Sequence, residues 1–162
     1  MNKFKTFLVF LISFILQTTI FSKIDIFGAN INIIIPAIVA LSQVLGVKIG
    51  PYGAMITGII EDFLFTNLIG PRALSYFLIG SFVSSDRFNF AKDRPTGIVM
   101  TFFASIFNFL LLTLIYFIFT RQNNLMNYLL LPLLIESILN TLIYFIYYHI
   151  VKKIMYIPTY RI

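Results

Sequence analysis

Residues 97–120 read GIVMTFFASIFNFLLLTLIYFIFT, an apolar run without a charged side chain. An α-helix rises about 1.5 Å per residue, so a helix over this run is long enough to cross the hydrocarbon core of a bilayer, which is about 30 Å thick. On either side of this run, further apolar blocks alternate with short polar breaks. Such blocks are typical of successive membrane spans rather than of amphipathic helices. They predict an all-α, polytopic integral membrane protein.

The composition of the chain favours the same class. Of the 162 residues, 59% are hydrophobic and 11% are charged, whereas a soluble domain averages about a quarter charged residues. The net charge is +6, but the basic residues are scattered between apolar blocks and form no surface suited to nucleic acid. Zero cysteines and a single histidine exclude disulfides, thiolate zinc sites and any multi-histidine metal site within one chain.

No segment has the signature of a catalytic or cofactor site. The chain contains no nucleophile elbow, zinc-binding motif or phosphate-binding glycine loop. Residues 50–53 are glycine-rich, but they follow no strand and open a membrane helix. We therefore predict no enzyme and no cofactor, and we expect function to arise within the bilayer and at its two faces.

We predict a single transmembrane domain over residues 1–162, with six helices at approximately 6–22, 31–46, 50–66, 70–86, 97–120 and 125–151. The basic start of the first helix also occurs in signal peptides, but no small-x-small cleavage site follows, which favours a retained helix. The second, third and fourth helices are short for a core of about 30 Å. Residues 31–65 therefore either span the membrane twice or form a re-entrant hairpin, and both versions keep the two termini on one side.

Lysine and arginine predict the orientation. With six spans, one side of the membrane receives three basic residues, Lys23, Arg72 and Arg121. The other side receives nine: Lys3, Lys5, Lys48, Arg87, Lys92, Arg94, Lys152, Lys153 and Arg161. Because an excess of lysine and arginine marks the cytoplasmic side, both termini are predicted to be cytoplasmic.

The third predicted helix carries small residues at helical spacing. One ridge consists of Gly50, Ala54, Gly58 and Asp62, and the adjacent ridge consists of Gly53, Thr57 and Glu61. Small side chains on one face let another helix approach closely in lipid. The face either docks a partner or packs against a neighbouring span of the same chain. A docking face predicts that Gly58→Leu disrupts partner association while leaving membrane insertion intact.

Two acids lie near the outer end of this helix. Burying Glu61 and Asp62 in a membrane is costly, so both need an explanation. Arg72 follows across a short turn. An ion pair that closes this corner is the simplest interpretation, and contact with a partner or proton or ion transfer are the alternatives.

Further polar side chains lie within other helices. Glu136 is close to the middle of the last helix, with Asn140 one turn further on, and Asn108 lies within residues 97–120. Together with Gln17, they either line a polar cavity for a solute or form interhelical hydrogen bonds. For Glu136, a functional or partner-facing role stands beside the structural one.

Three stretches of the chain resemble one family of membrane proteins. They are residues 32–41 (NIIIPAIVAL), 50–62 (GPYGAMITGIIED) and 68–74 (LIGPRAL). They resemble the MreD family of rod shape-determining membrane proteins, which has a G-x-x-x-G-x-x-x-D helix followed by a Gly-x-x-Ala-Leu corner. The residues at the matching positions are Ala54, Gly58 and Asp62 in the helix and Gly70, Ala73 and Leu74 in the corner.

The resemblance implies a non-enzymatic scaffold subunit of the bacterial cell-elongation complex, in the inner membrane. The implied partners are a bitopic MreC protein, cytoskeletal MreB, and the peptidoglycan glycosyltransferase and transpeptidase. The family's fold is similar to the substrate-binding subunits of energy-coupling-factor transporters, so a small-solute, vitamin-like binding subunit is the alternative function. Those subunits are expected to dock their energising module through small residues on the first helix, and residues 6–21 contain no alanine or glycine.

Overall fold

The computed structural model describes residues 2–46, 49–85, 93–120 and 130–155. These residues form six α-helices, a short 3₁₀ turn and a two-stranded ribbon. In chain order the elements are α1 (Asn2–Thr19), η1 (Phe21–Lys23), β1 (Asp25–Ile26), β2 (Ala29–Asn30), α2 (Ile34–Leu45), α3 (Gly50–Phe65), α4 (Pro71–Val83), α5 (Arg94–Thr120) and α6 (Leu130–Ile154).

Each predicted span overlaps one of these helices, which confirms the all-α prediction. Residues 125–129 of the sixth predicted span lie outside the described residues. Helix α5 begins slightly earlier than predicted because Asp93 caps it, accepting a hydrogen bond from the Thr96 N–H at 3.2 Å. Hydrogen bonds from the Thr96 side chain and backbone lower the pKa of Asp93. Several basic residues used for the orientation lie outside the described residues: Lys48, Arg87, Lys92, Arg121 and Arg161.

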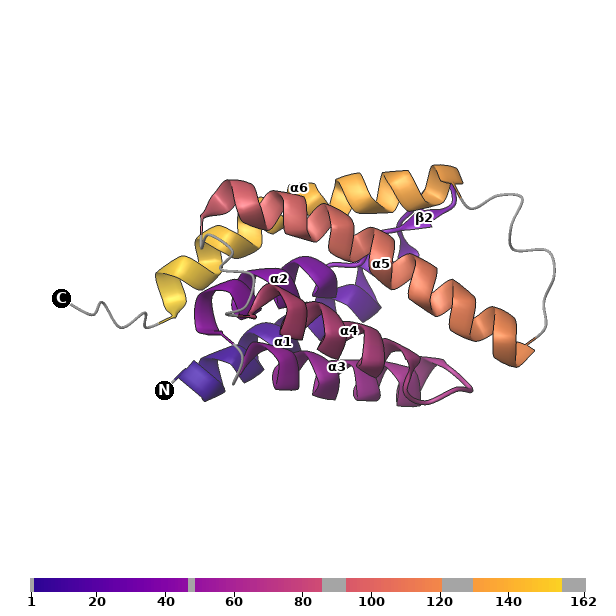
Figure 1. Ribbon diagram of the computed structural model, residues 1–162, viewed down its shortest axis with the longest axis horizontal. Helices are drawn as coiled ribbons and strands as arrows, with labels where there is room; N and C mark the ends of the chain where they lie inside the picture. The colour runs from indigo at the N-terminus through magenta and orange to yellow at the C-terminus, as the bar shows by residue number, and fades with distance from the viewer. Residues whose placement is uncertain (1, 47–48, 86–92, 121–129, 156–162) are drawn as a thin grey trace.

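Helix α2 is the centre of the bundle. It contacts each of the other five helices, with α1, α3 and α4 on one side and α5 and α6 on the other (Figure 1). Its residues from Ile34 to Gln43 are all buried. At about 18 Å, α2 is shorter than the hydrocarbon core of a bilayer. It can nevertheless lie within a membrane protein because the surrounding helices shield it from lipid.

The start of α1 and the end of α6 lie together. Lys5 Nζ donates a hydrogen bond to the Ile154 carbonyl at 2.7 Å, and the hydroxyls of Ser13 and Tyr147 are 2.6 Å apart. We call this the terminal end of the bundle (left in Figure 1). The opposite end carries the ribbon and the turn between α3 and α4, and we call it the corner end.

A ribbon that the sequence reading did not predict leads into α2. Asp25 pairs with Asn30 and Ile26 with Ala29. Between them, Phe27 and Gly28 have φ values of 54° and 81°, as in a type I′ hairpin turn. The Asp25 carboxylate accepts a hydrogen bond from the Gly28 N–H at 2.7 Å, which stabilises this turn.

The outer surface of the bundle is apolar. Large side chains of five described helices, all except α2, are exposed on it, among them Phe7, Phe63, Leu74, Phe103 and Ile146. Water does not tolerate an apolar surface of this extent, whereas lipid does. Three described helical segments are long and apolar enough to cross a membrane: residues 2–23, 94–119 and 130–154. Helices α3 and α4 are shorter, with 16 and 13 residues.

Candidate functional site

One buried carboxylate holds the corner between α3 and α4. Asp62 is fully buried, and its Oδ2 accepts three backbone hydrogen bonds, from Gly70 (2.9 Å), Arg72 (3.0 Å) and Ala73 (3.4 Å). The N–H groups in the first turn of a helix have no partner within that helix. Asp62 therefore caps α4 from a different helix, and its charge lies at the positive end of the α4 dipole.

The local sequence directs the chain back onto Asp62. Gly70 has a φ of 121°, a conformation that side chains disfavour. Pro71 follows at the first position of α4, where its missing N–H costs nothing. Thr66 directly follows the last residue of α3. Its hydroxyl lies 2.8 Å from the carbonyl oxygens of Asp62 and Leu68. The turn thus aims the free N–H groups of α4 at one carboxylate.

Gly58 lets α3 and α4 approach each other closely. A β-carbon added to Gly58 would lie 2.6 Å from both the amide nitrogen and the Cα of Ala73. This geometry explains the pairing of a small residue in the helix motif with an alanine in the corner. The spacing of Gly58 and Asp62 then places the close contact and the cap one turn apart on the same face of α3.

The small-residue faces of α3 are covered by the chain's own helices. A β-carbon at Gly53 would lie 2.7 Å from the Phe10 ring of α1, and one at Gly50 would lie 2.6 Å from the Cα of Ser42 in α2. Ala54 is fully buried. Packing within the chain therefore accounts for these residues. A leucine at Gly58 would collide with the α4 backbone, so we expect Gly58→Leu to disturb the fold as well as any partner contact, and its effect on membrane insertion stays a prediction.

Arg72 pairs with both acids, which confirms the predicted ion pair. Its Nη1 lies 3.4 Å from Asp62 Oδ1, and its Nε lies 3.8 Å from Glu61 Oε2. The Arg72 side chain is 27% exposed, whereas both acids are buried. Desolvation offsets much of the attraction within such a pair, so its role is to satisfy the acids and fix the corner.

A chain of hydrogen bonds leads from this corner across the bundle. The Tyr76 hydroxyl donates to Glu61 Oε2 at 2.7 Å and accepts from Asn32 Nδ2 at 3.2 Å. The Asn32 N–H donates to Asn140 Oδ1 at 2.9 Å, and Asn140 Nδ2 donates to Ser105 Oγ at 3.0 Å. The network joins α3, α4, α5, α6 and the segment before α2. Polar groups in lipid-facing bundles favour such bonds between helices.

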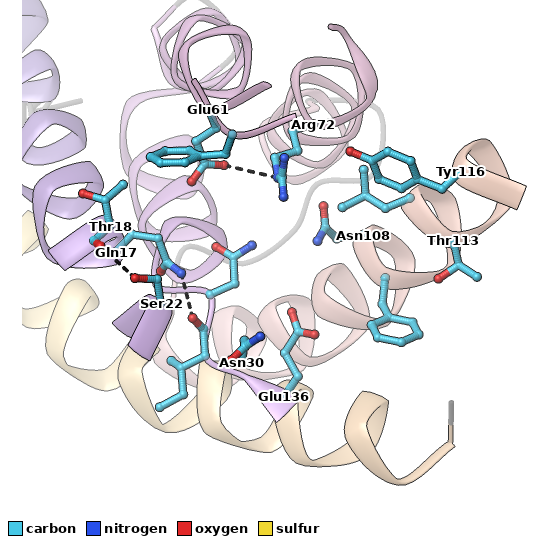
Figure 2. A pocket seen from close by; sticks show the side chains of 15 residues that line it. Gln17, Thr18, Ser22, Asn30, Glu61, Arg72, Asn108, Thr113, Tyr116 and Glu136 are labelled. Carbon is cyan, nitrogen blue, oxygen red and sulfur yellow. Dashed lines mark hydrogen bonds and ion pairs between the residues drawn. The ribbon is translucent and has the colours of Figure 1, made fainter. Parts of the chain in front are cut away.

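A cavity of about 680 Å³ opens at the corner end. Figure 2 shows Glu61 and Arg72 on one side, Glu136 across from them and Asn108 between, with Gln17 on a third side. The other polar lining residues are Thr18, Ser22, Asn30, Asn32, Thr113 and Tyr116. Within the described ranges, no three acidic or histidine side chains are grouped so that they could hold a metal ion.

The polar side chains within the helices were expected either to line a cavity or to form interhelical hydrogen bonds, and the structure shows both arrangements. Asn108 and Gln17 line the cavity and also form structural hydrogen bonds, Asn108 with Ser75 at 2.7 Å. Gln17 bonds to the backbone just before α2. Asn140 belongs to the network and its amide lies beside Glu136, which lines the cavity.

The sequence reading missed Tyr76, the fully buried centre of the network. The sequence could have indicated this residue, because Tyr76 follows Arg72 by four residues and therefore lies on the same face of the helix.

The fold and this site define a helical integral membrane protein whose short inner helices are locked by a carboxylate-capped corner. The family model for rod shape-determining protein MreD matches residues 1–154, and the chain belongs to this family. No curated protein and no solved structure matches the chain. The protein is thus a rod shape-determining protein of the bacterial inner membrane. The resemblance carried by residues 32–74 extends over almost the whole sequence.

Proposed function

We propose that the protein is a non-enzymatic scaffold subunit of the bacterial cell-elongation complex. It holds a bitopic, MreC-like partner in the membrane and connects it to cytoskeletal MreB and to the peptidoglycan glycosyltransferase and transpeptidase. The observation that carries the proposal is the match to the MreD family over residues 1–154. A bundle locked by a buried polar network suits this role, because a scaffold must keep its surfaces in a fixed arrangement.

We also propose that the chain is one domain whose six helices all cross the bilayer, with the terminal end in the cytoplasm. The distribution of described basic residues supports this orientation. Arg94 Cζ and Lys152 Nζ each lie over the Tyr148 ring, 5.6 Å from its centroid. Lys5 contacts the end of α6. These cations therefore gather at the terminal end.

The partner's transmembrane helix would contact the outward face of α3. Both small-residue faces of this helix are already covered, so partner contact is left to its exposed side chains: Tyr52, Ile56, Ile59, Ile60 and Phe63. Helix association in membranes depends on close packing of such faces. A bulky substitution at Ile56 should therefore separate the partners without reaching the core.

The cavity favours a second candidate function, a solute-binding subunit of an energy-coupling-factor type transporter. Its polar lining and its volume of about 680 Å³ suit a small solute. The absence of alanine and glycine from residues 6–21 disfavours docking of an energising module on the first helix. The two functions predict different partners.

Affinity purification of the tagged protein from its native membranes in mild detergent, with mass spectrometry of the recovered proteins, tests the proposal. We expect an MreC-like protein and peptidoglycan-synthesis proteins. Recovery of paired ATPases with a coupling subunit would instead support the transporter function.

The partner face is tested by Ile56→Trp, with Ile138→Trp on the exposed face of α6 as the matched control. We expect Ile56→Trp to reduce recovery of the MreC-like protein at least tenfold while Ile138→Trp retains it. Equal recovery with both variants would exclude α3 as the contact.

A further inference from the structure

The cavity at the corner end has the features of a ligand site and is distinct from the proposed partner face. Its volume of about 680 Å³ lies within the range of about 300–1,000 Å³ typical of small-molecule sites. Glu136 projects into it opposite Glu61 and Arg72 (Figure 2). Phe109 and Leu112 of α5 supply an apolar part of the wall. A ligand here would meet both charged and apolar surface.

The charges around the cavity are not balanced among the described residues. Arg72 is the only cation of the described residues that lines it, and it is already shared between Glu61 and Asp62. Glu136 adds another carboxylate, and no cation of the described residues forms an ion pair with it. A carboxylate inside a membrane protein is costly without a partner. A positively charged ligand group would remove that cost.

The hydrogen-bonding groups also distinguish Glu136 from its neighbours. Gln17 uses both ends of its amide on the backbone of Ile31 and Ile33, at 2.9 Å each, and Glu61 is engaged by Tyr76 and Arg72. These groups hold the structure together. The Glu136 carboxylate has the Asn140 amide beside it, but a carboxylate accepts about four hydrogen bonds. It therefore retains acceptor capacity toward the cavity.

We propose that this cavity binds a ligand through a primary ammonium group, with Glu136 as the counter-ion. A primary ammonium has three N–H donors, which match the spare acceptor sites of this carboxylate. The apolar wall would accommodate the carbon atoms of the ligand. Two sources supply such a group: the ethanolamine headgroup of a phospholipid from the bilayer, and a water-soluble amine from the aqueous side.

The experiment uses the purified full chain in detergent micelles. Dioleoyl-phosphatidylethanolamine is compared with dioleoyl-phosphatidylcholine, whose trimethylated nitrogen has no N–H donor, and glycerophosphoethanolamine provides the water-soluble arm. Native mass spectrometry measures binding, and the thermal unfolding midpoint reports stabilisation by the bound ligand. Glu136→Gln preserves the shape of the side chain without its charge. Asp93→Asn, at the terminal end, is the matched control.

We expect phosphatidylethanolamine to bind at least tenfold more tightly than phosphatidylcholine. Glu136→Gln should lose at least tenfold in affinity, whereas Asp93→Asn should bind normally. Binding of glycerophosphoethanolamine identifies an aqueous source, and its failure alongside lipid binding identifies the bilayer source.

Equal affinity for the two lipids, or unchanged affinity in Glu136→Gln, would overturn the proposal. If Glu136→Gln does not fold, the comparison of headgroups on the unmodified chain decides the question alone. Because the readout is binding to the isolated chain, failure here leaves the scaffold proposal intact.

Discussion

Gly58 on α3 and Ala73 on α4 meet backbone to backbone, so closely that a β-carbon on Gly58 would lie 2.6 Å from the Ala73 amide nitrogen and Cα. One turn further along α3, Asp62 caps the same turn of α4. Close approach and capping thus depend on each other. The cap reaches the α4 backbone only because no side chain separates the two helices.

Gly58→Ala should destabilise the protein, and Gly58→Leu should prevent stable folding. Overpacking a close contact costs about 1–3 kcal/mol, and here the clashing atoms belong to backbone that cannot turn aside. The measurements are monodisperse yield in detergent and the thermal unfolding midpoint. Ile59→Leu, on the neighbouring lipid-facing position, is the control and should behave like the unmodified chain. Normal stability of Gly58→Leu would show that α3 and α4 do not meet in this way.

Asp62→Ala should destabilise the protein more than Asp62→Asn. Alanine removes every acceptor from the α4 N-terminus, whereas asparagine retains one oxygen but loses the charge that favours the helix dipole. Hydrogen bonds to a charged group contribute about 1.5–3 kcal/mol each, so the alanine variant should lose at least that amount. Unfolding midpoints give the order. Asp25→Asn, which affects one hydrogen bond in the exposed ribbon, should cost little.

Tyr76→Phe should destabilise the bundle although it changes one atom. The hydroxyl satisfies Glu61 at 2.7 Å and receives a bond from Asn32 at 3.2 Å, so its loss leaves buried polar groups unpaired at about 1–3 kcal/mol. Tyr52→Phe is the matched control, because the Tyr52 side chain is exposed. Equal unfolding midpoints for the two variants would contradict a network centred on Tyr76.

Hydropathy predicts the helices of this chain but not their arrangement. Lipid is as apolar as a protein core, so the buried helix α2 and the lipid-facing face of α5 have the same kind of sequence, and no amphipathic stripe distinguishes them. The residues that do carry packing information are the small and polar ones. The sequence positions of Gly58, Asp62 and Arg72 are therefore sufficient to predict the corner between α3 and α4.

The rest of the site depends on contacts between distant segments. Asn32 and Asn140 are separated by 108 residues yet share a hydrogen bond, and sequence spacing alone contains no information about that pairing. The ribbon was missed for a local reason. Phenylalanine is an unusual residue at a positive-φ turn position, and Phe27 occupies one.

Single cysteines should establish the orientation, because the chain has none of its own. Phe27 is 78% exposed at the tip of the ribbon, and Lys153 is exposed near the end of α6. With six spans and cytoplasmic termini, Phe27→Cys should react with a membrane-impermeant maleimide in intact spheroplasts. Lys153→Cys should react only after permeabilisation. The reverse pattern would invert the orientation.

A cysteine at Leu45 should distinguish two full spans from a re-entrant hairpin over residues 31–65. Leu45 is the last residue of α2, at the terminal end, where Gly50 packs against Ser42. If α2 and α3 cross the bilayer, Leu45→Cys should behave like Lys153→Cys and react only after permeabilisation. If the two helices turn back within the membrane, Leu45→Cys should stay unreactive until the protein is dissolved in detergent. We expect the first result, because α2 reaches the same end of the bundle as the Lys5–Ile154 contact, with Gln43 bonded to Asp93 and Tyr144 there.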